Sequence, residues 1–339
     1  MLQIGPHSFK NRVFLAPMAG ISDLVYRRFA RRAGCALTYS EFVSAAGLFF
    51  NPSKHQPILD IDADEHPVAI QIFGNDLKQL AFAAQKVEAM GADIVDINMG
   101  CPVPKVVSQG AGAALLKNPA RVAEILRTVK AAVKIPVTLK TRSGWDKENI
   151  NVLEIARIAE GEGAAAIALH PRTRSMGHSG KPDWSVIGDV KKAVSIPVIG
   201  NGGIETPQDA KQMLAETGCD FVMIGSATMG NFHLIRQTIH YLESGELLAD
   251  LSIAEKARMA LDHARENCAY WDAPRGAREM RKIFPGYLKG FAGASELRKQ
   301  LNSAEDFERI DEILRPLLTS PSYVSQPNNP PSPFAPAHC

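Results

Sequence analysis

Short apolar runs alternate with amphipathic stretches along the chain between residue 12 and about residue 245. This alternation is typical of parallel strands joined by crossover helices. Eight strands are predicted, at residues 12–17, 36–41, 68–74, 94–98, 137–142, 166–170, 198–201 and 221–225. Eight β/α units at a spacing of roughly 30 residues match the size of an α/β fold of the (β/α)8 TIM-barrel type.

Residues that favour helix starts support this count. Asp76, Asn118 and Thr206 each precede a stretch with helical spacing of apolar residues, and Pro119 and Pro207 follow two of them. Asp, Asn and Thr side chains accept hydrogen bonds from the first free N–H groups of a helix, and proline fits its first position. We therefore expect helices directly after these residues.

The pattern changes after Gly245, where helical spacing continues and no further strand is predicted. We expect helices at 253–267, 274–289 and 304–318. The chain then divides into a barrel at residues 1–245, a C-terminal helical domain at 246–319 and a Pro/Ser-rich tail at 320–339. The tail has too few apolar residues to form a core, so we expect it to be disordered.

The charge of the chain is nearly balanced, but one segment is strongly basic. Lys and Arg number 38 against 36 Asp and Glu, a net charge of +2, so no overall basic field indicates a nucleic-acid partner. Residues 275–299 hold seven cations against two glutamates, namely Arg275, Arg278, Arg281, Lys282, Lys289, Arg298 and Lys299. This segment predicts contacts with phosphates, and a solvated helix face is the simpler alternative.

Five widely spaced cysteines form neither CxxC pairs nor a cluster with histidines, which argues against a disulfide framework and against a metal site. The N-terminal residues lack the features of a signal peptide. No apolar run approaches the roughly 18 residues that suggest a membrane span. We expect a cytoplasmic protein without membrane contact, and a monomer as the default.

In TIM barrels the reactive groups gather at the C-terminal ends of the strands. Most of the predicted strand ends here carry polar residues or glycines. The residues at these ends are Pro17-Met18-Ala19, Gln71, Asn98 with Cys101, Lys140 with Arg142, His170 with Arg172, Asn201-Gly202-Gly203, and Gly225-Ser226. The last two strands end in glycines, where the backbone can approach a phosphate. A phosphorylated ligand is therefore predicted at that side of the barrel.

Cys101 lies in a loop between Gly100 and Pro102, which is an unusual place for a structural thiol. From position alone, a catalytic role and a buried structural thiol are equally good interpretations. A thiol with its ordinary pKa of about 8.5 is mostly protonated at neutral pH, so it can donate a proton as readily as it can act as a nucleophile.

The strand-end motifs resemble those of the tRNA-dihydrouridine synthases, which are FMN-dependent barrels with a C-terminal helical domain. The motifs are Ala16-Pro-Met-Ala-Gly20, Asp96-Ile-Asn-Met-Gly-Cys-Pro102, Thr138-Leu-Lys-Thr-Arg142, His170-Pro-Arg-Thr-Arg174, Asn201-Gly-Gly203 and Ile224-Gly225. They follow the order and spacing of the family over residues 1–318. The bacterial B-type branch is the most similar.

The resemblance implies an FMN site at the strand ends. Pro17, Met18 and Ala19 would lie along the flavin ring, Gln71 would bond its pyrimidine edge, and Lys140 would stabilise its reduced anionic form. His170 would support the flavin. The ribityl phosphate would be held by Asn201, Gly202, Gly203, Gly225 and Ser226. The family usually has arginine where Ser226 stands, so this chain would lack one charge-assisted phosphate contact.

The implied reaction is reduction of the uracil C5=C6 bond in a D-loop uridine of tRNA, with hydride passing from flavin N5 to C6 and a proton from Cys101 to C5. Asn98 and Arg172 would hold the uracil edge. NADPH or NADH would reduce the flavin at the same opening, since no second dinucleotide fold is predicted. The tRNA would be contacted by Arg275, Arg278, Arg281 and Lys282. Similarity to the B-type branch suggests position 17.

Two other functions fit part of the pattern. An FMN barrel that acts on a free pyrimidine, of the dihydroorotate or dihydropyrimidine dehydrogenase type, would need no basic helices. A tRNA-binding protein without catalysis would need the helices, but not Cys101, Lys140 and His170 together.

Overall fold

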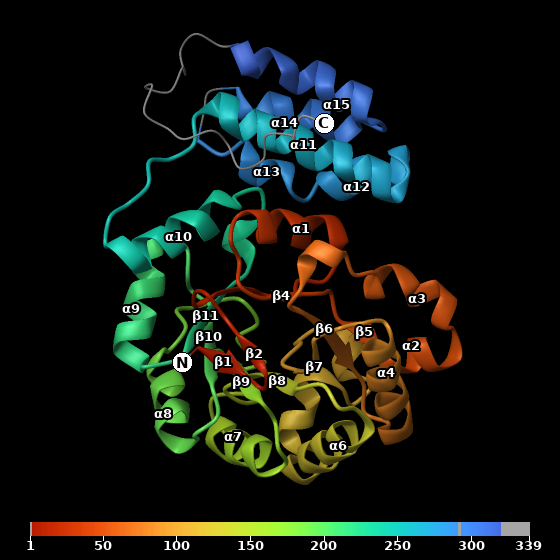
Figure 1. Cartoon of the computed structure of the whole chain (residues 1–339), viewed down its shortest axis with the longest axis vertical. Helices are drawn as coiled ribbons and strands as arrows, with labels where there is room; N and C mark the ends of the chain where they lie inside the picture. Colours follow the sequence, from red (N-terminus) through yellow and green to blue (C-terminus); the bar gives the residue numbers. More distant parts are fainter. Residues whose placement is uncertain (1, 291–292, 320–339) are drawn as a thin grey trace.

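The computed structural model describes residues 2–290 and 293–319, and its larger part is a barrel of parallel strands surrounded by helices (Figure 1). Pairing of Phe14 with Leu37 closes the ring between the first and last strands of the sheet. The strands run in the order β3 (Val13–Leu15), β11 (Phe221–Ile224), β10 (Val198–Asn201), β9 (Ala166–His170), β8 (Val137–Arg142), β7 (Ile94–Met99), β6 (Val68–Phe73) and β4 (Thr38–Tyr39). The predicted (β/α)8 fold is confirmed, with each predicted strand in its place.

Three short strands were not predicted. β5 (Val43–Ser44) pairs with β6, and β1 (Gln3–Ile4) pairs with β2 (His7–Ser8) in an antiparallel hairpin. Phe9, directly after this hairpin, packs edge-on against Phe14 and Phe221 inside the barrel. Phe221 is the first residue of β11, so the hairpin covers the amino end of the barrel. The carboxyl end is left for the functional site.

The outer helices begin where the capping residues predict. Side chains of Asp76, Asn118 and Thr206 accept from backbone N–H groups at the starts of α4, α6 and α9. The helices outside the strands are α1 (Leu24–Arg32), α2 (Ala45–Phe50), α3 (Pro52–Leu59), α4 (Leu77–Ala89), α5 (Pro104–Val107), α6 (Pro119–Ala132), α7 (Val152–Gly161), α8 (Ser185–Ala193), α9 (Pro207–Thr217) and α10 (His233–Ser244). Short 3-10 turns occur at η1 (Ala63–Glu65), η2 (Gly112–Lys117) and η3 (Ser226–Thr228).

Helices are the only regular elements among the described residues after Ser244. They are α11 (Ile253–Trp271), α12 (Ala273–Met280), α13 (Phe284–Tyr287), α14 (Ala294–Ser303), α15 (Phe307–Leu314) and η4 (Arg315–Thr319). The division at residue 245 into separate folding units stays a prediction. The tail predicted to be disordered, residues 320–339, lies outside the described residues.

The helices of this region differ from the predicted ones in three ways. The helix predicted at 274–289 is interrupted between Met280, the end of α12, and Phe284, the start of α13. Pro285, in the first turn of α13, lacks an N–H to donate to the preceding turn. α14 was missed because only Ala294 and Leu301 are fully buried, so the apolar pattern is weak. The helix predicted at 304–318 begins three residues later, at Phe307, with Asp306 as its N-cap.

The helical region lies against α1 and the end of the barrel (Figure 1). The ring of His263 from α11 stacks on Phe29 of α1, with centroids 4.6 Å apart. α13 approaches the segment after β11 so closely that a methyl group on Gly286 would overlap the backbone of Met229. A tight crossing of this kind fixes where the helical region sits on the barrel.

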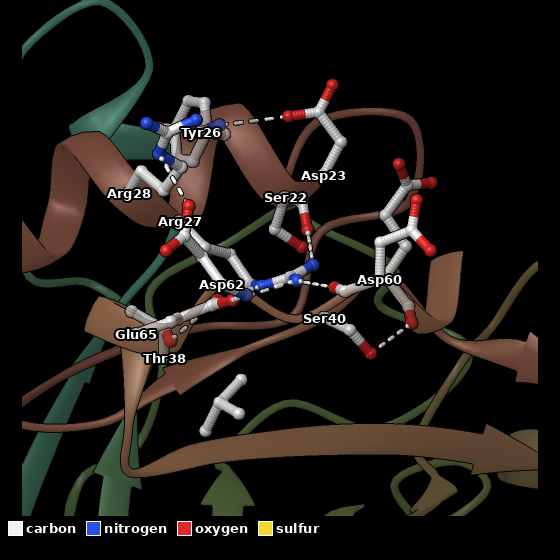
Figure 2. Close-up of polar contacts among 12 residues, drawn as sticks. Ser22, Asp23, Tyr26, Arg27, Arg28, Thr38, Ser40, Asp60, Asp62 and Glu65 are labelled. Atoms are coloured by element: carbon white, nitrogen blue, oxygen red, sulfur yellow. Dashed lines mark hydrogen bonds and ion pairs between the residues drawn. The ribbon is translucent and has the colours of Figure 1, made fainter. Parts of the chain in front are cut away.

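A buried ion pair anchors the start of α1. Arg27 and Glu65 are both fully buried and bonded to one another, and Figure 2 shows Arg27 reaching from α1 toward Glu65 and Asp60. The guanidinium also donates to the carbonyls of Ser22, at 3.2 Å, and Asp60, at 2.7 Å. Thr38 adds a hydroxyl bond to Glu65 at 3.3 Å. The pair therefore ties α1 to η1 and β4.

Candidate active site

A cavity of about 510 Å³ opens at the carboxyl ends of the strands. Thirteen of the eighteen predicted site residues line it, namely Pro17, Met18, Ala19, Asn98, Cys101, Lys140, His170, Arg172, Asn201, Gly202, Gly203, Gly225 and Ser226. They come from six strand ends that are far apart in the sequence. The structure therefore brings together the residues predicted from strand-end position.

Gln71 does not line this cavity, and its assignment to the flavin stays a prediction. Its side chain is fully buried, where it donates to Asp96 at 2.6 Å and accepts from Asn98 at 2.8 Å. Asp96 also accepts from Thr138 at 2.6 Å. Residues 71, 96 and 138 are in register on neighbouring strands, so they form one polar layer of the barrel interior. Gln71 thus supports Asn98 from within the barrel.

Cys101 lies in the cavity wall with 8% of its surface exposed. Its N–H donates to the Asn98 side chain at 2.9 Å, and its carbonyl accepts from Ala113 at 3.1 Å. Gly112 is needed beside it, because the φ of Gly112 is +58° and a Cβ there would lie 2.8 Å from the Cys101 oxygen. Burial raises the pKa of the Cys101 thiol, so it is protonated at neutral pH.

Arg142 has a structural role that the sequence did not indicate. It is 3% exposed and donates to the carbonyls of Gly100 at 2.8 Å, Thr173 at 3.1 Å and Gly177 at 2.7 Å. It therefore links the loop that carries Cys101 to the loop after β9. Its position at a strand end was the only sequence signal. His178 and Glu205 also line the cavity and had no such signal.

Lys140 and His170 both line the cavity. Lys140 donates to the Asn201 side chain at 2.8 Å, and Asn201 in turn donates to the Met223 carbonyl at 2.8 Å. Burial, with Arg142 nearby, lowers the pKa of Lys140 to about 8. Burial and the Lys140 charge lower the pKa of His170 to about 2, so its imidazole is neutral.

The glycines after β10 bring the backbone close to the cavity. Gly202 and Gly203 have φ values of +103° and +77°, which favour glycine. A Cβ at Gly202 would lie 2.8 Å from Nε2 of His170, and one at Gly203 would lie 2.6 Å from Pro182. The Trp184 indole holds the loop by donating to the Gly202 carbonyl at 3.0 Å. Side chains at these positions would close the approach for a ligand.

The four predicted tRNA-contacting cations lie outside this cavity and differ in their partners. Arg275 and Arg278 are exposed on α12, and Arg275 lies 3.6 Å from the centre of the Trp271 ring. Arg281 is partly buried and donates to the Ala304 carbonyl at 3.1 Å. Lys282 donates to the Gly20 carbonyl at 3.0 Å. Arg278 donates from Nε to the Pro274 carbonyl at 3.1 Å. Arg281 and Lys282 are therefore held by residues distant in the sequence, whereas the contacts of Arg275 and Arg278 are to residues within four positions of them.

Within residues 2–290 and 293–319, no group of three or more His, Cys, Asp or Glu side chains is arranged to hold a metal ion. In the same part of the chain, no helix combines the length and the apolar character needed to cross a membrane.

The family profile described as dihydrouridine synthase (Dus) matches residues 14–320. This chain belongs to the dihydrouridine synthase family. Among its relatives, tRNA-dihydrouridine synthase B of Pseudomonas aeruginosa is 41% identical over 306 residues, covering 90% of this chain and 92% of that protein. Probable tRNA-dihydrouridine synthase 1 of Synechocystis is 42% identical over 314 residues, covering 92% of this chain and 88% of that protein.

These matches confirm the family resemblance and its B-type character. As a member of the dihydrouridine synthase family, the chain is an oxidoreductase. A solved structure of 2-naphthoyl-CoA reductase in complex with 2-naphthoyl-CoA matches with a TM-score of 0.59 and 15% identity, covering 72% of this chain and 51% of that one. At this identity, the likeness concerns the barrel fold alone.

Proposed function

We propose that this protein is an FMN-dependent tRNA-dihydrouridine synthase that reduces the C5=C6 bond of a D-loop uridine in tRNA, at position 17. The observation that carries the proposal is the meeting of Cys101, Lys140, His170 and Asn201 at one cavity, in a chain of the dihydrouridine synthase family. A reductase of an aromatic base needs a bound electron carrier and a proton donor, and the cavity has residues suited to each.

The residues present fit FMN. The glycine backbone at Gly202, Gly203 and Gly225, with the hydroxyl of Ser226, suits a phosphate, and Lys140 supplies a cation for an electron-rich ring. Nδ1 of His170 is buried without a hydrogen-bond partner among the described residues, which suits a site completed by a ligand. Met18 and Ala19, with Pro17, form an adjacent wall. When bound, FMN would supply hydride chemistry for reduction of the uracil ring, with NADPH or NADH as the source of electrons.

Cys101 is the proton donor in this proposal, giving the proton of its thiol to uracil C5. Its raised pKa keeps the proton in place at neutral pH, which is the form that an acid catalyst needs. Asn98 donates one N–H to Gln71, and we assign its second N–H to a uracil carbonyl. Arg172 donates from Nε and Nη2 to the Gly180 carbonyl, and its Nη1 lies 3.4 Å from Nε2 of His170. We assign the second N–H of Nη1 to the other uracil carbonyl.

The function is tested with purified protein, FMN, NADPH and unmodified tRNA, with dihydrouridine mapped by mass spectrometry. We expect one dihydrouridine, at position 17. Free uracil and orotate are the matched alternative substrates, because a free-pyrimidine reductase would turn them over. Absence of dihydrouridine in a flavin-loaded preparation would contradict the proposal, and so would turnover of the free bases at the rate of tRNA.

Lys140 makes the binding of FMN sensitive to pH. Because its pKa is about 8, its ammonium is present at neutral pH and is lost as the pH rises through 8. We expect FMN affinity of the apoprotein, measured by fluorescence quenching, to fall between about pH 7 and about pH 9.5 as this cation is neutralised. Lys140→Met should bind FMN roughly tenfold more weakly at neutral pH and with a flat profile. The same profile in both proteins would contradict this assignment.

Arg275 and Arg278 are the cations of α12 that remain available for tRNA phosphates, because both are exposed and lie one turn apart. We expect Arg275→Ala/Arg278→Ala to reduce the salt dependence of tRNA binding by about two units of slope, roughly one per phosphate contact. FMN affinity should be unchanged. Arg127→Ala/Lys192→Ala, which removes two exposed charges from the barrel helices α6 and α8, serves as the control for a general loss of charge. Equal slopes in wild type and double variant would favour the solvated-face alternative.

A further inference from the structure

Residues 17–23 join β3 to α1 and form one wall of the candidate active site through Pro17, Met18 and Ala19. The segment is folded on itself, since the Met18 N–H donates to the Ser22 hydroxyl and the Ser22 N–H donates to the Met18 carbonyl, both at 2.9 Å. Any group that moves the middle of this segment therefore also moves Met18.

The Gly20 peptide at the middle of the segment is held from both sides. Its N–H donates to the Glu41 carboxylate, which belongs to the barrel, and its carbonyl accepts from Nζ of Lys282 at 3.0 Å. Gly20 has a φ of +70°, and a Cβ there would lie 3.2 Å from that same Nζ. Lys282 is kept in place by Glu279, whose carboxylate is 2.7 Å away.

A second contact from the helical region reaches the same segment. Nε1 of Trp271, at the end of α11, donates to the Asp23 carboxylate at 2.9 Å, and Asp23 is the N-cap of α1. A second cavity, of about 230 Å³, is lined by Gly20, Asp23, Trp271 and Lys282. The segment therefore presents Met18 and Ala19 to the first cavity and Gly20 to the second.

We propose that Lys282, a residue of the helical region, is a positioning residue for the flavin site, because it holds the Gly20 peptide. Its ammonium donates to the Gly20 carbonyl while the Gly20 N–H donates to Glu41, so the segment is held on both sides. These two bonds thereby set the positions of Met18 and Ala19 in the cavity. A charged donor on a backbone carbonyl is a strong contact for an exposed side chain. The inference rests on the proposed function, since it takes FMN as the ligand of that cavity.

Lys299 offers a matched control for Lys282. Each lysine pairs with a glutamate three residues earlier, Glu279 for Lys282 and Glu296 for Lys299, but Lys299 is on α14 and 75% exposed. Lys282→Met and Lys299→Met therefore remove the same charge and the same kind of local ion pair. Only the first removes a bond to the barrel. Lys282→Arg keeps a cation that can reach the Gly20 carbonyl.

The first measurement is amide hydrogen exchange in apoprotein, on peptides that cover residues 17–23. Lys282→Met should speed exchange of this segment by about tenfold, the effect of losing one charge-assisted hydrogen bond. Lys299→Met should match wild type, and Lys282→Arg should restore most of the protection. Unchanged exchange in Lys282→Met would overturn the inference without involving any ligand.

The second measurement is the affinity of each apoprotein for FMN alone, with the flavin absorption spectrum of the complex. We expect Lys282→Met to bind FMN about tenfold more weakly and with a shifted spectrum, and Lys282→Arg to recover both. Wild-type protein that binds no FMN would overturn the proposed function itself. Wild-type binding together with unchanged affinity and spectrum in Lys282→Met would overturn this inference alone.

Discussion

Cys101→Ala is expected to lower the rate of dihydrouridine formation by about 10²- to 10⁴-fold, the contribution that a positioned general acid makes. FMN content and NADPH oxidation in air should be nearly unchanged. The reason is that the thiol lies in the cavity wall and is protonated, so that it acts on the uracil ring. The measurement compares dihydrouridine per tRNA with NADPH consumed, for the same enzyme concentration.

Cys219→Ala is the control for this change. Cys219 is buried and its thiol pKa is also raised by burial, but it does not line the cavity. The Cys219→Ala variant should have a lower free energy of unfolding, because packing contacts are lost, and should keep full activity. If Cys101→Ala formed dihydrouridine at the wild-type rate, another group would have to protonate C5. Equal losses in the two variants would point to a structural cause.

The largest loss of stability is expected from Arg27→Met. The change leaves the Glu65 carboxylate fully buried without its cation, and it removes donors from the Ser22 and Asp60 carbonyls (Figure 2). Removing one partner of a buried ion pair costs about 3–5 kcal/mol of the free energy of unfolding. Urea denaturation followed by tryptophan fluorescence measures this loss.

Two further variants separate the buried charge from other effects. Arg27→Met/Glu65→Leu removes both charges and should recover part of the loss, because the two carbonyls still lack donors. Arg127→Met breaks the pair with Glu162, in which Arg127 is 67% exposed, and should cost less than about 1 kcal/mol. A loss as small in Arg27→Met as in Arg127→Met would mean that the buried carboxylate finds another partner or takes up a proton.

The sequence was most informative where local chemistry and the barrel pattern coincide. Asp76, Asn118 and Thr206 were predicted as caps and act as caps, because a cap depends only on the next few residues. Cys101 and Lys140 were placed at one site because Cys101 follows a strand and Lys140 lies near the end of one. All parallel strands of a barrel end at the same rim, so this position in the sequence fixes a place in space.

Within the barrel, the folded structure sets whether a polar side chain lies in the buried polar layer or reaches the cavity. Gln71 and Asn98 both belong to strands, yet Gln71 is one layer deeper and bonds Asp96, whereas Asn98 reaches the cavity. The stagger between strands sets this depth, and it depends on pairings that are distant in the sequence. The sequence therefore predicted the polar character of Gln71 but not its partner.

The basic segment shows the same limit for charges. The sequence alone shows that residues 275–299 are rich in cations, and it shows the order of the strand-end motifs that place the chain in its family. It does not show that Arg281 donates to the Ala304 carbonyl or that Lys282 donates to the Gly20 carbonyl. Those partners are 23 and 262 residues away along the chain. A cation's role depends on which acceptors the packing of the helical region brings within reach, and only the folded chain decides that.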